Sequence, residues 1–132
     1  MADVWKSFKP WVDKVAASFG LTPQQLIAMK ILGEFGSMTM SELAINLGCD
    51  ASNVTSIVDK LQTRGFVERQ SSEHDRRVKT LVMTTDGTEL YVRARERFHQ
   101  PPPAIANLDE RDKLELCSIM QRALDSLGTR AS

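Results

Sequence analysis

Apolar and polar residues alternate with helical spacing in two short runs near the middle of the chain. The first run spans residues 40–47, and Thr39 with Glu42 three positions later makes a capping-box pattern at its start. The second run spans residues 51–63 and has apolar residues at i, i+3, i+4 and i+7, namely Val54, Ile57, Val58 and Leu61. This spacing predicts two amphipathic helices, each with one apolar face packed inward.

A three-residue turn separates the two predicted helices. Gly48 supplies backbone freedom, Cys49 follows it, and the Asp50 carboxylate can accept hydrogen bonds from the free N–H groups of the second helix. Gly65 then ends the second helix. Two helices joined by so short a turn are typical of a helix-turn-helix motif.

A hairpin pattern follows the second helix directly. Residues 66–70 and 78–84 have the composition of strands, and the polar loop of residues 71–77 joins them and carries Arg76 and Arg77. The order helix, turn, helix and basic hairpin predicts a winged helix-turn-helix. The predicted fold class is mainly α with a small β-hairpin wing.

Apolar stripes also mark the two ends of the chain. The N-terminal helix carries the stripe Trp5, Phe8, Trp11, Val12, Val15 and Phe19, and a C-terminal helix opened by residues 108–110 carries Leu114, Cys117, Met120, Leu124 and Leu127. Between them a helix starts after Thr85 and runs to His99, where Pro101–Pro103 must end it. A small winged unit has little surface left to bury these stripes, so we expect a two-fold homodimer in which the N- and C-terminal helices form the dimerisation region.

The outward face of the second helix is rich in small hydrogen-bonding residues. This face includes Ser52, Asn53, Ser56 and Lys60. Small side chains let a helix approach base edges closely, so these four residues are candidates for the major groove of double-stranded DNA. Arg76 or Arg77 can enter the minor groove, with Asp75 holding one guanidinium, and Thr39 and Ser41 can touch phosphates.

A series of short motifs runs through the chain in a fixed order: Leu21–Gln25, Ser41–Ala44, Leu47–Gly48, Val54–Thr55, Val58–Leu61, Gly65–Arg69, Asp75–Arg77 and Thr84–Gly87. In these motifs the chain resembles the MarR family, the multiple-antibiotic-resistance type of bacterial transcriptional regulator. Two features depart from the family pattern. Ser56 stands where the family often carries arginine, and Pro101–Pro103 falls where the family usually continues a long helix.

The resemblance implies a single domain over residues 1–132. Its winged core would span about 22–84, and its dimerisation helices about 3–19 and 86–128. It also implies a repressor that binds a near-palindromic operator and responds to a small aromatic or phenolic effector. Trp11 and Phe19 are candidates to border the effector pocket.

Composition restricts the class of protein but does not identify its function. The 132 residues carry no net charge, but six basic and four acidic residues between Asn53 and Met83 give that segment a net charge of +2. Two cysteines and the absence of a long apolar run predict a cytoplasmic protein with no disulfide framework and no membrane segment.

Two alternatives to the operator-binding regulator stay open from sequence. The mild charge also fits a winged-helix module for protein contacts, and Cys49 at a helix N-terminus also fits a redox-responsive regulator. No Ser/His/Asp set or phosphate-binding Gly loop is present, so we expect no enzyme. His74 and His99 lack the spacing of metal ligands, so we expect neither a metal nor a cofactor.

Overall fold

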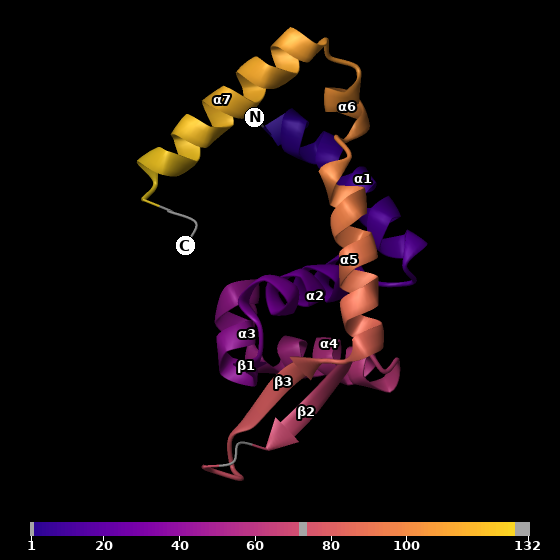
Figure 1. The fold of residues 1–132 in the computed structure, drawn as a ribbon, viewed down its shortest axis with the longest axis vertical. Helices are drawn as coiled ribbons and strands as arrows, with labels where there is room; N and C mark the ends of the chain where they lie inside the picture. Colours follow the sequence, from indigo (N-terminus) through magenta and orange to yellow (C-terminus); the bar gives the residue numbers. More distant parts are fainter. Residues whose placement is uncertain (1, 72–73, 129–132) are drawn as a thin grey trace. The chain divides into compact units, whose positions relative to one another are not determined.

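The computed structural model describes residues 2–71 and 74–128, and within the first helix it leaves out the side chains of residues 2, 4 and 5 (Figure 1). The predicted packing of Trp5 and the wing-loop residues Ser72 and Glu73 therefore lie outside the described part. The chain divides after His99 into two compact units, each of which is described by itself.

The first unit contains five helices and three strands among its described residues. In chain order they are α1 (Ala2–Ser18), α2 (Pro23–Phe35), β1 (Met38–Thr39), α3 (Met40–Leu47), α4 (Ala51–Thr63), β2 (Val67–Ser71), β3 (Lys79–Met83) and α5 (Thr85–His99). The mainly helical fold with a small sheet confirms the predicted fold class.

The two central helices begin and end where the sequence pattern places them. The Glu42 backbone N–H donates to Thr39 Oγ1 at 3.2 Å, and the Thr39 N–H donates to Glu42 Oε2 at 2.7 Å, which completes the capping box of α3. Asp50 Oδ1 accepts the Asn53 N–H at 2.9 Å and caps α4. Gly48 has a φ of +62°, the left-handed conformation that lets the chain turn between the helices.

The sheet has one strand more than the predicted hairpin. Its order is β1-β3-β2, with both pairings antiparallel. The extra strand, β1, pairs Met38 with Leu81 and Thr39 with Thr80. The hairpin strands run over residues 67–71 and 79–83 rather than 66–70 and 78–84. Phe66 lies outside β2 because its N–H bonds to the Leu61 carbonyl oxygen of α4, and Val78 lies outside β3 because its N–H bonds to the Asp75 carbonyl oxygen in the wing loop.

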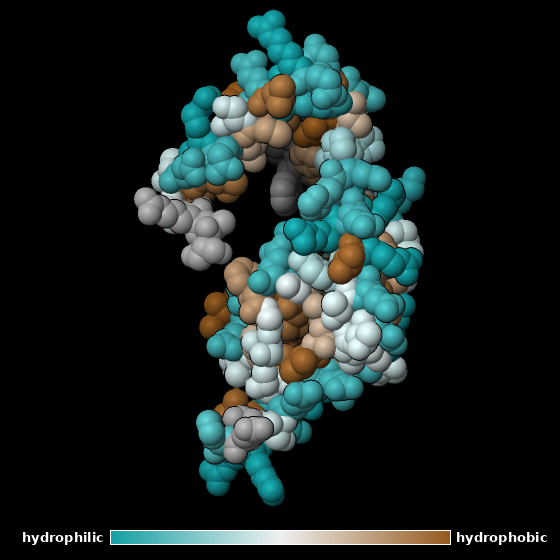
Figure 2. Space-filling view, in the orientation of Figure 1, coloured by the Kyte–Doolittle hydropathy of each residue, from teal (hydrophilic) through white to brown (hydrophobic). Residues whose placement is uncertain are grey.

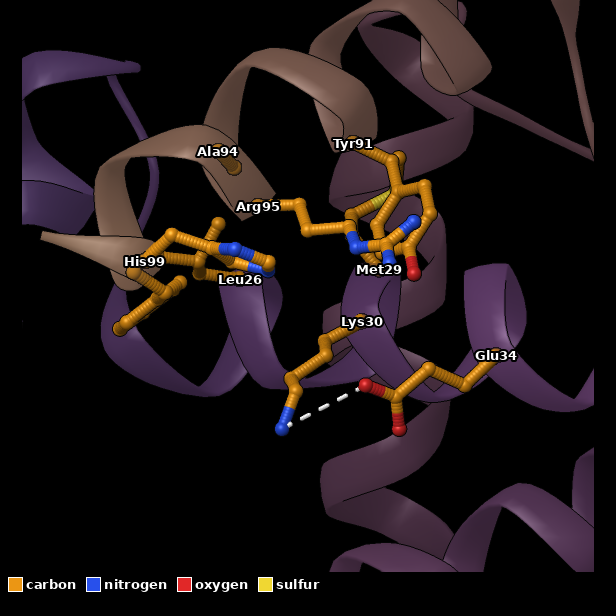
Figure 3. Close-up of a pocket in the computed structure, with 9 residues that line it drawn as sticks. Leu26, Met29, Lys30, Glu34, Tyr91, Ala94, Arg95 and His99 are labelled. Carbon is orange, nitrogen blue, oxygen red and sulfur yellow. Dashed lines mark ion pairs between the residues drawn. The ribbon is translucent and has the colours of Figure 1, made fainter. Parts of the chain in front are cut away.

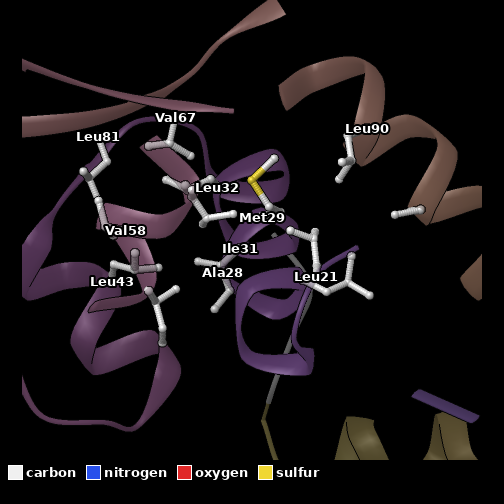
Figure 4. Packing of buried hydrophobic residues seen from close by; sticks show 14 of the residues in the cluster. Leu21, Ala28, Met29, Ile31, Leu32, Leu43, Val58, Val67, Leu81 and Leu90 are labelled. Atoms are coloured by element: carbon white, nitrogen blue, oxygen red, sulfur yellow. The ribbon is translucent and has the colours of Figure 1, made fainter. Parts of the chain in front are cut away.

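Helix α2 lies at the centre of the core (Figure 4). Figure 4 shows Ala28, Met29 and Ile31 of α2 between side chains of α3 and α4 on one side and Leu90 of α5 on the other. Val67 and Leu81 close the core from the sheet, and both are almost completely buried. One continuous core thus holds the sheet, α3 and α4 in fixed places relative to α2.

The N-terminal aromatic stripe has part of its contacts within the first unit. Val15 is 2% exposed, and the Trp11 ring meets the edge of Phe98 from α5 with ring centroids 5.3 Å apart. The expectation that the winged unit has little surface left for this stripe is thus met only in part, because α5 covers some of it. Phe8, Val12 and Phe19 stay half-buried.

The second unit contains α6 (Pro103–Ala106) and α7 (Glu110–Ser126). The proline run ends α5 at His99 as predicted, and Pro103 begins the new helical turn, a position that proline tolerates. No described residue of α7 is buried: Leu114 is 71% exposed, and Cys117 is exposed too. Leu127, which directly follows the helix, is 76% exposed. Figure 2 shows apolar side chains at the surface of this helix. The apolar stripe of α7 is therefore uncovered within its own unit.

Candidate nucleic-acid interface

Helix α4 separates an apolar face from a polar face cleanly. Its four inward residues, Val54, Ile57, Val58 and Leu61, are 6% exposed or less. The four predicted major-groove residues, Ser52, Asn53, Ser56 and Lys60, are all exposed and lie on the opposite side. The core therefore fixes which face of α4 is offered to a partner.

Hydrogen bonding at the start of α4 leaves the Asn53 side chain available. Ser52 Oγ donates to Asp50 Oδ1 at 2.8 Å, which holds that hydroxyl against the cap. Asn53 uses its backbone N–H for the same cap oxygen. Its amide keeps both a donor and an acceptor, the pair that can read adenine in the major groove.

These hydrogen bonds lower the pKa of Asp50 below its ordinary value of 3.8. The largest cause is the bond from the Asn53 backbone N–H, followed by the bond from the Ser52 hydroxyl. Both bonds favour the charged carboxylate. The cap of α4 is thus strongest when Asp50 is ionised.

The Asp50 cap predicts an acid-dependent contribution to stability. Because the folded-state pKa is depressed, the contribution is complete above pH 3.8 and is lost as the pH falls through the folded-state pKa. Asp50→Ala should therefore be less stable than the wild type at pH 7, and the difference should shrink below about pH 4. Thermal unfolding between pH 2.5 and 7 measures it. Asp50→Ser keeps a cap that does not titrate, so its stability should depend less on pH than that of the wild type. If the stability difference between Asp50→Ala and the wild type is the same at every pH, this role of Asp50 is contradicted.

Thr39 and Ser41 have different places at the start of α3. Thr39 is half-buried, since it pairs with β3 and its hydroxyl oxygen accepts the capping bond. Ser41 is exposed in the first turn of α3. Ser41 is therefore free to meet a phosphate with its hydroxyl, whereas Thr39 chiefly positions the N-terminus of α3.

The wing extends from the sheet and carries the predicted arginines at its tip. Arg76 and Arg77 are exposed, and Figure 2 shows hydrophilic side chains at this end of the molecule. Asp75 Oδ1 accepts the backbone N–H of Arg77 at 2.9 Å, and the structure describes no ion pair between Asp75 and either guanidinium. In the described loop, Asp75 thus supports the wing through a turn in the backbone.

Two further arginines form hydrogen bonds within the fold, and the sequence pattern predicted neither set of contacts. From β2, Arg69 donates to Asp59 Oδ1 at 2.6 Å and to Gln62 Oε1 at 2.5 Å, so it ties the wing strand to α4. Arg64 donates to backbone carbonyl oxygens of Phe19 and Gly20. Both were counted among the basic residues of the segment, yet their partners lie elsewhere in the fold. The basic residues left for a nucleic acid in this region are Lys60, Arg76, Arg77 and Lys79.

The predicted pocket residues line two different hollows. Trp11 borders an apolar depression between α1 and α2, and Phe19 borders a smaller one that also contains Arg64 and Arg93. Phe19 is also covered by the Arg93 guanidinium, whose Cζ lies 5.6 Å from the ring centroid. Within the described unit, Trp11 and Phe19 thus do not share one pocket.

A third pocket, of about 330 Å³, lies between α2 and α5 (Figure 3). It is lined by Leu26, Met29, Lys30, Glu34, Tyr91, Ala94, Arg95, Phe98 and His99. Figure 3 shows Arg95 and His99 above the Lys30–Glu34 ion pair, whose charged atoms are 3.5 Å apart. Tyr91 lies directly against Gly33, where a Cβ would be 2.6 Å from the ring. This pocket combines aromatic walls with an excess of cations.

Cys49 packs against the hydrophobic core as a half-buried free thiol. That is the ordinary environment of a small apolar residue in a tight turn. Among the described residues, no group of three or more His, Cys, Asp or Glu side chains is placed to hold a metal ion. Nor does this part of the chain contain a helix with the length and apolar content needed to cross a membrane.

Comparisons with known proteins agree with this geometry. The family model described as MarR family matches residues 21–79, which cover α2 to the start of β3. YfiV, an HTH-type transcriptional regulator of Bacillus subtilis, is 31% identical over 108 residues, which are 79% of this chain and 67% of YfiV.

Solved structures share the fold at low sequence identity. The reduced form of MarR from E. coli superposes with a TM-score of 0.80 at 20% identity, covering 94% of this chain and 96% of that one. NadR in complex with 4-hydroxyphenylacetate gives a TM-score of 0.71 at 23% identity, covering 93% and 87%. The capped helix pair, the basic wing, the match to the family model and these relatives agree. The chain belongs to the MarR family of DNA-binding transcriptional regulators.

Proposed function

We propose that this protein is a homodimeric repressor that binds a near-palindromic operator and releases it when a small effector binds. The proposal rests on two exposed features of the same unit, the polar face of α4 and the two arginines of the wing. A helix in the major groove with a hairpin arginine in the minor groove reads two features of one half-site.

The proposed dimer uses the helices outside the winged core. In this proposal, residues of about 22–84 form the winged core, and residues of about 3–19 and 86–128 supply the dimerisation region of one domain. The exposed apolar stripe that runs along α7 and ends at Leu127 supports this assignment, because Leu114 and Leu127 are more than two thirds exposed and a second copy would remove them from water. Sedimentation of the protein with and without a bound duplex tests it. Two chains per duplex agree with the proposal, and a monomer bound to DNA contradicts it.

The Asn53 amide is proposed to provide specificity rather than general affinity. Asn53→Ala should cost about 1–3 kcal/mol of discrimination at one base pair while leaving binding to random DNA nearly unchanged. Lys60→Ala is the matched comparison on the same face, and it should weaken binding to all sequences alike. Competition assays with single-base operator variants measure both. An equal loss on every sequence in Asn53→Ala would contradict direct base reading.

The α2–α5 pocket is the proposed effector site. Its aromatic walls and its basic residues Lys30 and Arg95, with His99 as a further hydrogen-bonding side chain, suit an aromatic molecule that carries a carboxylate or phenolate. NadR, whose fold this chain shares, was solved with such a molecule, 4-hydroxyphenylacetate. An effector that prefers a dimer with the wrong separation of its α4 helices lowers operator affinity, and DNA lowers effector affinity by the same factor.

Variants of the pocket should separate effector response from DNA binding. Arg95→Met should raise the concentration of 4-hydroxyphenylacetate or a similar aromatic acid needed to release DNA by about tenfold or more, while operator affinity without effector stays close to that of the wild type. Lys14→Met, an exposed residue of α1 outside the lining, is the control. Titration of the fluorescent operator complex measures the effect. An unchanged release curve in Arg95→Met would place the effector elsewhere.

A further inference from the structure

Arg64 directly follows the last residue of α4 and reaches the corner between α1 and α2. Its Nη1 donates to the Gly20 carbonyl oxygen, and its Nη2 donates to that of Phe19 at 3.3 Å. The guanidinium also lies over the Phe66 ring, with Cζ 4.9 Å from the centroid. These contacts join segments that are 44 and 45 residues apart in the chain.

The carbonyl groups that Arg64 binds lie at the carboxyl end of α1. Carbonyl oxygens at this end of a helix lack helical partners and carry partial negative charge. Arg64 also stands at the carboxyl end of α4, where its backbone N–H donates to the Lys60 carbonyl oxygen at 3.2 Å. The guanidinium is therefore a cation at a place where two helix ends favour positive charge.

Gly20 makes this contact possible in two ways. Its φ of +66° lets the chain turn sharply after α1. A Cβ at this position would lie 3.2 Å from Arg64 Nη2 and 3.4 Å from Nη1, closer than the guanidinium can comfortably accept. A side chain at position 20 would thus require the guanidinium to shift by a few tenths of an ångström, which weakens its hydrogen bonds to the two carbonyl oxygens.

We propose that Arg64 is a positioning residue for operator binding. Its hydrogen bonds hold the carboxyl end of α4 against the α1–α2 corner. This inference rests on the proposed function, because α1 belongs to the proposed dimerisation region. In such a dimer, the Arg64 contacts fix the angle and separation at which the two α4 helices meet successive half-sites. The planar guanidinium holds two carbonyl oxygens at once, which the single ammonium of lysine cannot do with the same geometry.

The test measures how strictly the protein demands one half-site spacing. Affinity is measured for the selected operator and for versions with one base pair inserted or deleted between the half-sites, using the wild type, Arg64→Met, Arg64→Lys and Gly20→Ala. The ratio of the affinities cancels any general loss of charge or folded protein. The wild type should prefer the native spacing by about tenfold or more, which is at least about 1.4 kcal/mol. All three variants should lose most of this preference, and Arg64→Lys should keep the salt dependence of the wild type.

Gly36→Ala is the control for backbone strain. Gly36, at the carboxyl end of α2, also has a positive φ, of +80°, but a Cβ there would meet nothing within 4 Å. It should keep the spacing preference of the wild type. If the Arg64 and Gly20 variants bind more weakly but keep that preference, the inference is overturned while the proposed function stands. A wild type with no spacing preference overturns both.

Discussion

Gly87→Ala is expected to destabilise the first unit by about 3 kcal/mol, the upper end of what overpacking usually costs. A Cβ on Gly87 would overlap the backbone carbonyl oxygen of Phe66, and it would lie 3.0 Å from the carbonyl carbon and 3.3 Å from Met29 Cε. Because the obstacle is backbone, it cannot rotate away as a side chain would.

Hydrogen bonds at the same junction make a compensating shift costly. Thr84 Oγ1 donates to the Gly65 carbonyl oxygen at 2.6 Å and accepts the Gly87 N–H at 3.0 Å. The Thr84 N–H donates to the Phe66 carbonyl oxygen at 3.1 Å. Moving α5 away from Phe66 would break this set, which joins the end of α4, the sheet and α5.

Gly33→Ala is the matched control for Gly87→Ala. Gly33 also lies in a helix, but the atoms that its Cβ would meet belong to the half-buried Tyr91 ring, which can turn away. Alanine in place of glycine also favours the helix by up to about 1 kcal/mol. Denaturant unfolding should therefore show Gly33→Ala within about 1 kcal/mol of the wild type. An equally stable Gly87→Ala would contradict the close approach of α5 to Phe66.

Replacing Arg76 and Arg77 together with alanine is expected to lower operator affinity by about a hundredfold near physiological salt, which is about 2.7 kcal/mol. Both side chains are exposed at the tip of the wing, so their loss should not disturb the core. The slope of log affinity against log salt should fall by about 2, since two fewer cations displace counterions.

Lys6→Ala with Lys14→Ala removes the same charge from the exposed surface of α1 and serves as the control. Fluorescence anisotropy at four salt concentrations measures the affinity and the slope of each variant. A wing variant that behaves like the α1 control would show that the wing acts only as a diffuse positive charge. If the protein is instead a module for protein contacts, both variants should bind its protein partner as tightly as the wild type does.

Local signals account for the parts of the fold that the sequence predicted. The caps of α3 and α4, formed by Thr39 and Asp50, depend on residues within three positions, so spacing alone locates both helices. The short strand β1 went unpredicted because its two residues have no pattern of their own. It exists only because β3 offers an edge about 40 positions later, at Thr80 and Leu81.

The candidate site likewise contains residues that local sequence patterns predict and residues that only the tertiary fold brings together. The outward residues of α4 follow from the period of its apolar stripe, and the structure places them on one exposed face. Arg64 and Arg69 could not be distinguished in sequence from surface cations, because their partners come from the turn after α1 and from α4 through the tertiary fold. The α2–α5 pocket likewise depends on Tyr91 packing against Gly33, a contact between distant helices.

Selection of bound sequences from a random DNA pool tests whether this protein reads an operator. We expect a near-palindrome whose half-sites are about 10 base pairs apart, bound on the order of a thousandfold more tightly than random DNA of the same length. Measuring the winning duplex at several salt concentrations separates base reading from charge. If no sequence is enriched and binding disappears at modest salt, the claim that this protein reads an operator is wrong.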